Sequence, residues 1–76
     1  MPFITYTTVE GALTDEQKKA LSTALTDAVT NTLGEKLKPN VWVTLNEEPE
    51  GNFYIGGHGL KANMLKKLMN DSKANA

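Results

Sequence analysis

The feature that most constrains the fold is an amphipathic segment, residues 15–33, that lies between two runs of strand-forming residues. Its apolar side chains recur at intervals of three and four residues, which predicts a helix. Thr14-Asp15-Glu16-Gln17 has the spacing of a capping box at the start of this helix, and Gly34 follows its end. At 1.5 Å per residue the helix spans about 28 Å, which is long enough to return along a short sheet.

One strand is predicted on each side of this helix, over Pro2 to Val9 before it and over Asn40 to Asn46 after it. The first is partly apolar on both faces, which is typical of a strand that is covered on two sides. A strand, a long helix and a second strand form a βαβ unit, whose strands are parallel. We therefore expect a small α/β fold.

The C-terminal third predicts tight turns followed by a short helix. Residues 47–51 are acidic and turn-forming, and three glycines within four residues, at 56, 57 and 59, indicate tight turns. Apolar residues then recur at helical spacing from Leu60 to Met69, and we expect this helix to fray after Asp71. The chain, residues 1–76, is predicted to form a single domain.

Composition limits what can stabilise such a chain and what it can bind. A domain of 76 residues buries only about 60% of the surface that its unfolded form exposes. With no cysteine and one histidine, disulfides and an ordinary zinc site are excluded, which leaves self-association. The net charge of −1 favours neither nucleic acid nor an anionic membrane, and no apolar run has signal-peptide or transmembrane length. We expect a cytoplasmic homo-oligomer without a metal.

Pro2 is the first candidate for chemistry. If Met1 is removed, as the small second residue permits, the chain begins with a secondary amine. An α-amino group has a pKa near 8, so it is available as a base close to neutral pH. However, proline makes up about 5% of ordinary sequence, and roughly one chain in twenty begins Met-Pro by chance. The interpretation of Pro2 therefore depends on the motifs that accompany it.

Four motifs together resemble the small tautomerases typified by 4-oxalocrotonate tautomerase. They are Met1-Pro2, Glu10-Gly11, residues 14–18 (Thr-Asp-Glu-Gln-Lys) and residues 52–57 (Asn-Phe-Tyr-Ile-Gly-Gly). The resemblance covers about residues 2–60. It implies a βαβ unit with a hairpin, subunits that pair into homodimers and often into homohexamers, no cofactor, and Pro2 as the general acid/base.

The resemblance also suggests substrate-binding residues. Phe53 falls on the family's pocket aromatic, and an apolar wall lowers the pKa of an amine by disfavouring its charged form. The alternative for Phe53 is an ordinary core aromatic beside the hairpin. Trp42 offers an indole N–H and a flat apolar face, with packing at an interface as its alternative. His58 is a candidate to polarise a carbonyl or bind an anion, or else a solvated side chain. Val9 completes this predicted set.

The sequence departs from the family at two positions. Typical members hold the substrate carboxylate and carbonyl oxygen with two arginines. At the first of these positions this chain has Ala12 or Leu13, because one residue is inserted there, and at the second it has Trp42. The chain contains no arginine, so an identical neighbouring subunit cannot supply one either. Without the planar fork of arginine, we expect a smaller, less charged or more aromatic substrate than a dicarboxylate dienol.

The predicted function is that of a cofactor-free keto–enol tautomerase, an isomerase that acts on a small 2-oxo or enol acid, with Pro2 moving a proton between carbon and oxygen. Two alternatives remain open. In one, Pro2 starts hydration or dehalogenation of an unsaturated acid in the same fold. In the other, the chain is a non-catalytic oligomeric scaffold that kept the fold after losing its arginines.

Overall fold

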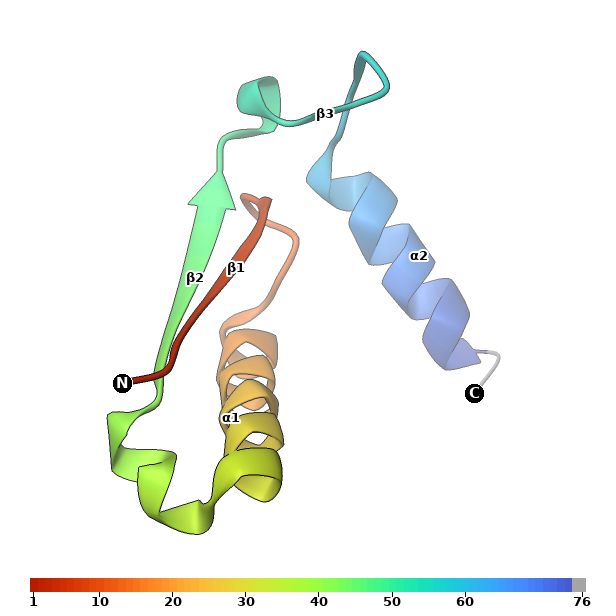
Figure 1. The fold of residues 1–76 in the computed structure, drawn as a ribbon. Helices are drawn as coiled ribbons and strands as arrows, with labels where there is room; N and C mark the ends of the chain where they lie inside the picture. Colours follow the sequence, from red (N-terminus) through yellow and green to blue (C-terminus); the bar gives the residue numbers. More distant parts are fainter. Residues whose placement is uncertain (75–76) are drawn as a thin grey trace. The chain divides into compact units, whose positions relative to one another are not determined.

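The computed structural model describes residues 1–74 and has an α/β fold with the predicted order of elements, as Figure 1 shows. The elements are β1 (Phe3–Val9), α1 (Asp15–Leu33), a 3₁₀ helix η1 (Glu35–Asn40), β2 (Trp42–Glu48), a 3₁₀ turn η2 (Glu50–Asn52), β3 (Tyr54–Ile55), β4 (His58–Gly59) and α2 (Ala62–Ala74).

The chain divides into two compact units. The first contains Met1–Tyr6 and Thr14–Asn46, which hold the start of β1, all of α1 and η1, and most of β2. The second contains Thr7–Leu13 and the described residues from Glu47 onward, which hold the end of β1, the hairpin and α2.

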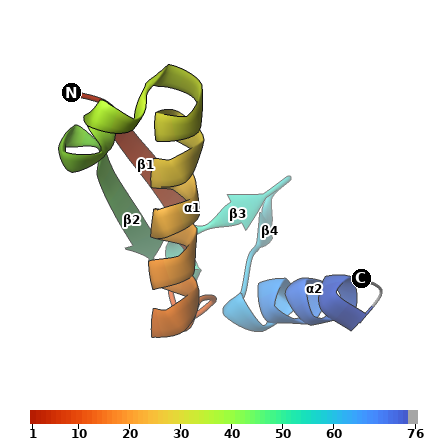
Figure 2. The ribbon, with the colours of Figure 1, turned by 90° about the horizontal axis from the view of Figure 1, so that it is seen from below.

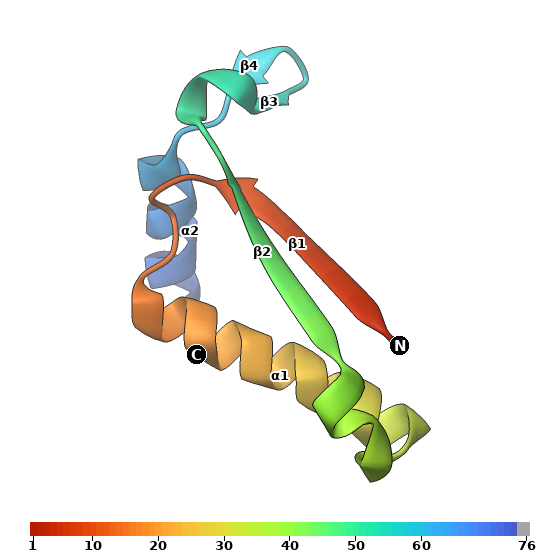
Figure 3. The ribbon, with the colours of Figure 1, turned by 90° about the vertical axis from the view of Figure 1, so that its left-hand side faces the viewer.

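The strands β1 and β2 form a two-stranded sheet and run in the same direction (Figure 3). Near their starts, the Trp42 N–H donates to the carbonyl oxygen of Pro2 at 3.0 Å, and at their ends the Glu10 N–H donates to the carbonyl oxygen of Glu48 at 2.7 Å. The predicted βαβ unit is therefore confirmed.

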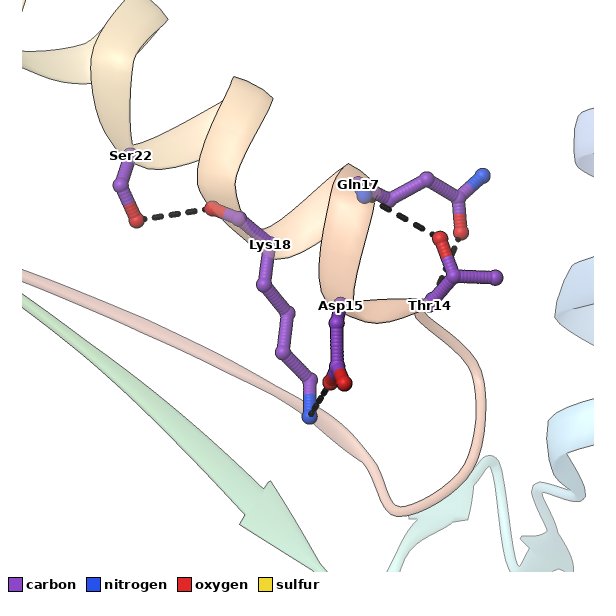
Figure 4. Close-up of polar contacts among 5 residues, drawn as sticks. All are labelled: Thr14, Asp15, Gln17, Lys18 and Ser22. Atoms are coloured by element: carbon purple, nitrogen blue, oxygen red, sulfur yellow. Dashed lines mark hydrogen bonds and ion pairs between the residues drawn. The ribbon is translucent and has the colours of Figure 1, made fainter.

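The helix α1 begins with the predicted capping box, which Figure 4 shows in close-up. The Gln17 N–H donates to the Thr14 hydroxyl oxygen at 3.1 Å, and the Thr14 N–H donates to the Gln17 side-chain oxygen at 2.9 Å. These bonds satisfy two of the amides that a helix leaves unpaired at its start. The helix ends at Gly34, whose φ of +135° is accessible to glycine and whose N–H donates to the Thr30 carbonyl oxygen at 2.9 Å.

In the first unit, α1 lies along one face of the strands (Figure 2). Ile4 of β1 and the apolar side of α1 line a common hollow there. The amphipathic pattern of the sequence thus turns its apolar side toward the sheet.

The strand β2 lies two residues further along the chain than the predicted Asn40–Asn46 strand. It starts later because Asn40 closes η1, where a polar connection was expected. It ends later because the Glu48 carbonyl oxygen accepts the Glu10 N–H and so extends the pairing. Pro49, which has no N–H to donate, then ends the strand.

The predicted hairpin is formed by β3 and β4, which pair antiparallel. Its two-residue loop consists of Gly56 and Gly57, with φ values of +57° and +83°. Two successive residues with positive φ match the twist of the flanking strands, and glycine adopts this conformation without strain.

The core of the second unit is small and apolar. It contains the buried residues Val9, Ala12, Leu60 and Ala62, with Phe53 and Leu65 packed against it.

The helix α2 continues to Ala74, so the expected fraying after Asp71 is wrong. Its first amide, the N–H of Ala62, donates to the carboxylate of Glu50 at 3.0 Å, although Glu50 lies twelve residues earlier. Lys73 in the last turn faces the negative end of the helix dipole, which stabilises that end.

Candidate active site

Pro2 is half-buried directly before β1, and Met1 in front of it is exposed. Its carbonyl oxygen is held by the N–H of Trp42 at 3.0 Å. Its ring nitrogen has no N–H and takes no part in the strand ladder. While Met1 is attached, this nitrogen is an amide without basicity. If Met1 is removed, the same nitrogen is a secondary amine on a residue whose carbonyl oxygen is already held by Trp42.

The aromatic side chains of Phe3 and Trp42 lie next to each other, beside the backbone hydrogen bond between Pro2 and Trp42. The ring centroids of Phe3 and Trp42 are 5.6 Å apart, with an angle of 38° between the planes, and both side chains are exposed. This separation is typical of attractive aromatic pairs. Pro2 is thus joined by its backbone to one member of an exposed aromatic pair and precedes the other in the chain.

Phe3 is a neighbour of Trp42 that was not predicted from the sequence. The signal for it was present, because Phe3 follows Pro2 and the start of a parallel partner strand was predicted to lie beside it. The sequence did not indicate a register for the two strands, so it did not show which residue of β2 is the neighbour of Phe3.

Three predicted site residues lie in the second unit. Val9 is fully buried, at 0% exposure, in the core. Phe53 is half-buried against that core, and its carbonyl oxygen accepts the N–H of Leu60 at 2.8 Å. His58 is exposed in β4, opposite Ile55. The structure therefore groups Pro2 with Trp42 in one unit and Val9, Phe53 and His58 in the other.

Uncharged side chains occupy the positions where the family resemblance predicts arginines. Ala12 is buried in the core of the second unit, Leu13 is half-buried, and Trp42 is exposed beside Phe3. No group in these places presents a positive charge to a carboxylate.

Five further polar or charged side chains are exposed to solvent. Lys36 and Lys38 of η1, Lys61 before α2, and the tyrosines Tyr6 and Tyr54 are exposed. Over residues 1–74, no three histidine, aspartate or glutamate side chains gather into a group that holds a metal ion. No helix in the same part of the chain is long and apolar enough to cross a bilayer.

Comparison with known proteins identifies the family. Residues 2–63 match the family described as tautomerase enzyme. A probable tautomerase of Bacillus cereus is 38% identical over 60 residues, which are 79% of this chain and 95% of that protein. A probable tautomerase of Listeria monocytogenes is 40% identical over 57 residues, which are 75% of this chain and 90% of that protein.

Solved structures agree with these relatives. A structure of the 4-oxalocrotonate tautomerase isozymes from Methylibium petroleiphilum superimposes with a TM-score of 0.70 at 35% identity, over 82% of this chain and 97% of that one. TomN, a 4-oxalocrotonate tautomerase homologue in the tomaymycin biosynthetic pathway, gives a TM-score of 0.68 at 33% identity, over 76% and 86%. The chain therefore belongs to the tautomerase family, in the 4-oxalocrotonate tautomerase group of isomerases, which confirms the predicted family and enzyme class.

Proposed function

We propose that this protein is a cofactor-free keto–enol tautomerase in which Pro2, after removal of Met1, is the general acid/base. The observation that carries the proposal is the anchoring of Pro2 at the start of β1. The Trp42 N–H holds its carbonyl oxygen at 3.0 Å, whereas its nitrogen is uncommitted in the sheet. A base must be held within reach of the proton that it abstracts, and this bond supports a fixed position for the amine.

The reaction needs one proton carrier. In the direction from enol to ketone, the Pro2 amine accepts the hydroxyl proton of the enol and leaves an enolate, whose C=O double bond forms as its C=C bond is lost. The electron pair of the C=C bond then takes a proton from the Pro2 ammonium, so carbon gains a hydrogen and the amine returns to its starting state. General acid/base catalysis of this kind contributes about 10²- to 10⁴-fold.

The substrate that we propose is a 2-oxo or enol monoacid with an apolar or aromatic substituent. The exposed pair of Phe3 and Trp42 supports this choice, because it offers a flat apolar surface beside Pro2. The absence of arginine from the chain argues against a substrate with two carboxylates. In this proposal Phe53 and Val9 shape the apolar wall, and His58 is a hydrogen-bond donor to a substrate oxygen.

We also propose that the active form is a homodimer or a homohexamer. Large apolar side chains are exposed in both units, which is a surface that subunit contacts commonly cover. They include Phe3, Trp42 and Leu33 of the first unit and Tyr54, Ile55, Met64 and Leu68 of the second.

The test compares two substrates on two forms of the protein. Protein that begins at Pro2 should convert phenylenolpyruvate to its keto form with a higher kcat/KM than a dicarboxylate dienol. The matched control is the same chain with Met1 retained, whose blocked nitrogen should give no rate above background. Equal rates for both forms would overturn the role of Pro2 and favour the scaffold alternative. A preference for the dicarboxylate would overturn only the proposed substrate class.

A further inference from the structure

In the first unit, Phe3 and Trp42 lie on the face of the sheet that α1 does not cover. Ile4 lines the hollow beneath α1, and successive side chains of a strand point to opposite faces. Phe3 therefore points away from α1, and the Trp42 ring lies on the same side, with 5.6 Å between the ring centroids. Phe3 is 62% exposed and Trp42 52%. Neither ring is thus held in place by a core.

The backbone of Trp42 is anchored, but its side chain has little to hold it. Its N–H donates to the carbonyl oxygen of Pro2 at 3.0 Å, which fixes the point from which the indole extends. Rotation about the two side-chain torsions, with three staggered wells at the first and about two at the second, allows about six orientations. Within residues 1–74, the contact that distinguishes one of these orientations is the tilted pairing with Phe3.

We infer that Phe3 is a positioning residue, whose ring selects one orientation of the Trp42 indole and so preforms the surface on which an aromatic substrate binds. A tilted aromatic pair at this separation is attractive. Phe3 acts through Trp42 and makes no contact of its own with the substrate. The role toward substrate rests on the proposed function, whereas the hold on Trp42 exists in the protein without substrate.

The size of the effect follows from the number of orientations. If only one of about six binds the substrate, free rotation lowers the binding-competent fraction, and the apparent affinity falls in proportion. Loss of the Phe3 ring should therefore raise KM for phenylenolpyruvate about three- to sixfold. Because the amine of Pro2 is unchanged, kcat should stay within about twofold. Enolpyruvate, which has no aromatic ring to place on the indole, should show a smaller rise in KM.

Spectroscopy without substrate tests the hold on Trp42. The chain contains one tryptophan, so the tryptophan band in near-UV circular dichroism and the decay of fluorescence anisotropy report this side chain alone. Phe3→Leu stays apolar but loses the ring, and we expect a weaker band and faster local motion of the indole. Phe3→Tyr keeps the ring and should retain both signals. Tyr54→Leu, which removes an exposed ring in the second unit, is the matched control and should change neither.

A double-mutant cycle tests whether Phe3 acts through Trp42. All variants begin at Pro2, which mass spectrometry verifies. Phe3→Leu should raise KM for phenylenolpyruvate in the otherwise unchanged protein but should have no further effect on Trp42→Ala protein. Phe3→Tyr should keep the KM of the unsubstituted protein, because the ring is present.

Three results would overturn the inference. An unchanged indole signal in Phe3→Leu would show that Phe3 does not hold Trp42. An equal rise of KM with and without Trp42 would show that Phe3 binds the substrate by itself. A smaller species in sedimentation of Phe3→Leu would show that Phe3 packs between subunits, and we expect the size to be unchanged.

Failure of the proposed function gives a different pattern. Protein that begins at Pro2 would then convert neither enol, whereas the indole signals of Phe3→Leu and Phe3→Tyr would still differ. That pattern would remove the role toward substrate and leave the hold of Phe3 on Trp42 established.

Discussion

At Pro2 the two ends of one residue have different roles. The carbonyl oxygen joins the sheet through the Trp42 N–H, whereas the nitrogen lies outside the ladder. Pro2→Ala should therefore keep the strand pairing but replace the secondary amine by a primary one without the ring that fixes φ. We expect kcat/KM for an enol to fall at least about tenfold, within the range of a general base. Circular dichroism should show unchanged secondary structure, and full activity in this variant would contradict the assignment.

Trp42 is the residue at which a change of substrate class should be easiest to produce. Trp42→Arg restores a planar cation beside Pro2, and a bidentate pair with a carboxylate is strong and directional. We expect the ratio of kcat/KM for a dicarboxylate dienol to that for phenylenolpyruvate to rise about tenfold or more. Lys38→Arg, an exposed change in η1, is the control and should leave the ratio unaltered. An unchanged ratio in Trp42→Arg would place Trp42 outside the site.

The sequence singled out individual candidate residues, but it did not predict which residues lie beside them. Pro2 and Trp42 were identified, the former from its position and the latter from the family resemblance, and the structure joins them by a backbone bond. Phe3 was missed because its relation to Trp42 depends on strand register, which is a long-range property. The roles of Pro2, Trp42, Val9, Phe53 and His58 all stay predictions, since they concern the reaction or a bound substrate.

At the level of elements, local signals located α1 and the glycine turn, the family resemblance implied the hairpin, and long-range contacts decided the bounds of β2. The capping box and Gly34 give α1 its limits, and the glycine pair makes the hairpin turn. By contrast, β2 is extended by the bond between Glu10 and Glu48, whose partners are far apart in sequence. Periodicity alone cannot reveal such a partner.

The capping box of α1 allows a matched test of local stability. Thr14→Ala removes the hydroxyl that accepts the Gln17 N–H, and the free energy of unfolding should fall by about 1 kcal/mol. Thr23→Ala is the control, because that hydroxyl only donates back to the Lys19 carbonyl oxygen inside the helix. It should be neutral or slightly stabilising, since alanine has the higher helix propensity. Urea unfolding at one fixed protein concentration measures both, and equal losses would show that the cap has no special role.

At the level of the whole molecule, we propose that residues 1–76 act as one tautomerase domain. The family match of residues 2–63 takes in segments of both units, and the strands β1 and β2 each contribute residues to both. A cooperative unfolding transition that coincides by fluorescence of Trp42 and by far-UV circular dichroism is expected. Two separate transitions would indicate two independent units.

Self-association also belongs to this scale. Among the described residues, the buried apolar core consists of Val9, Ala12, Leu60 and Ala62, which is little for an independently stable fold. We therefore expect sedimentation at micromolar concentration to give a dimer or a larger species. A folded monomer of 8.3 kDa at that concentration would contradict this expectation.

If the nitrogen of Pro2 is the base, the pH–rate profile of the processed protein reports its titration. The amine must be unprotonated to accept a proton, so kcat/KM for an enol should rise with pH through the pKa of the free enzyme's amine. In an apolar neighbourhood that includes Phe3 and Trp42, this pKa should lie below the ordinary α-amino value near 8. The limb should vanish, together with the rate, in protein that retains Met1. A profile and rate that are the same with and without Met1 would show that another group carries the proton.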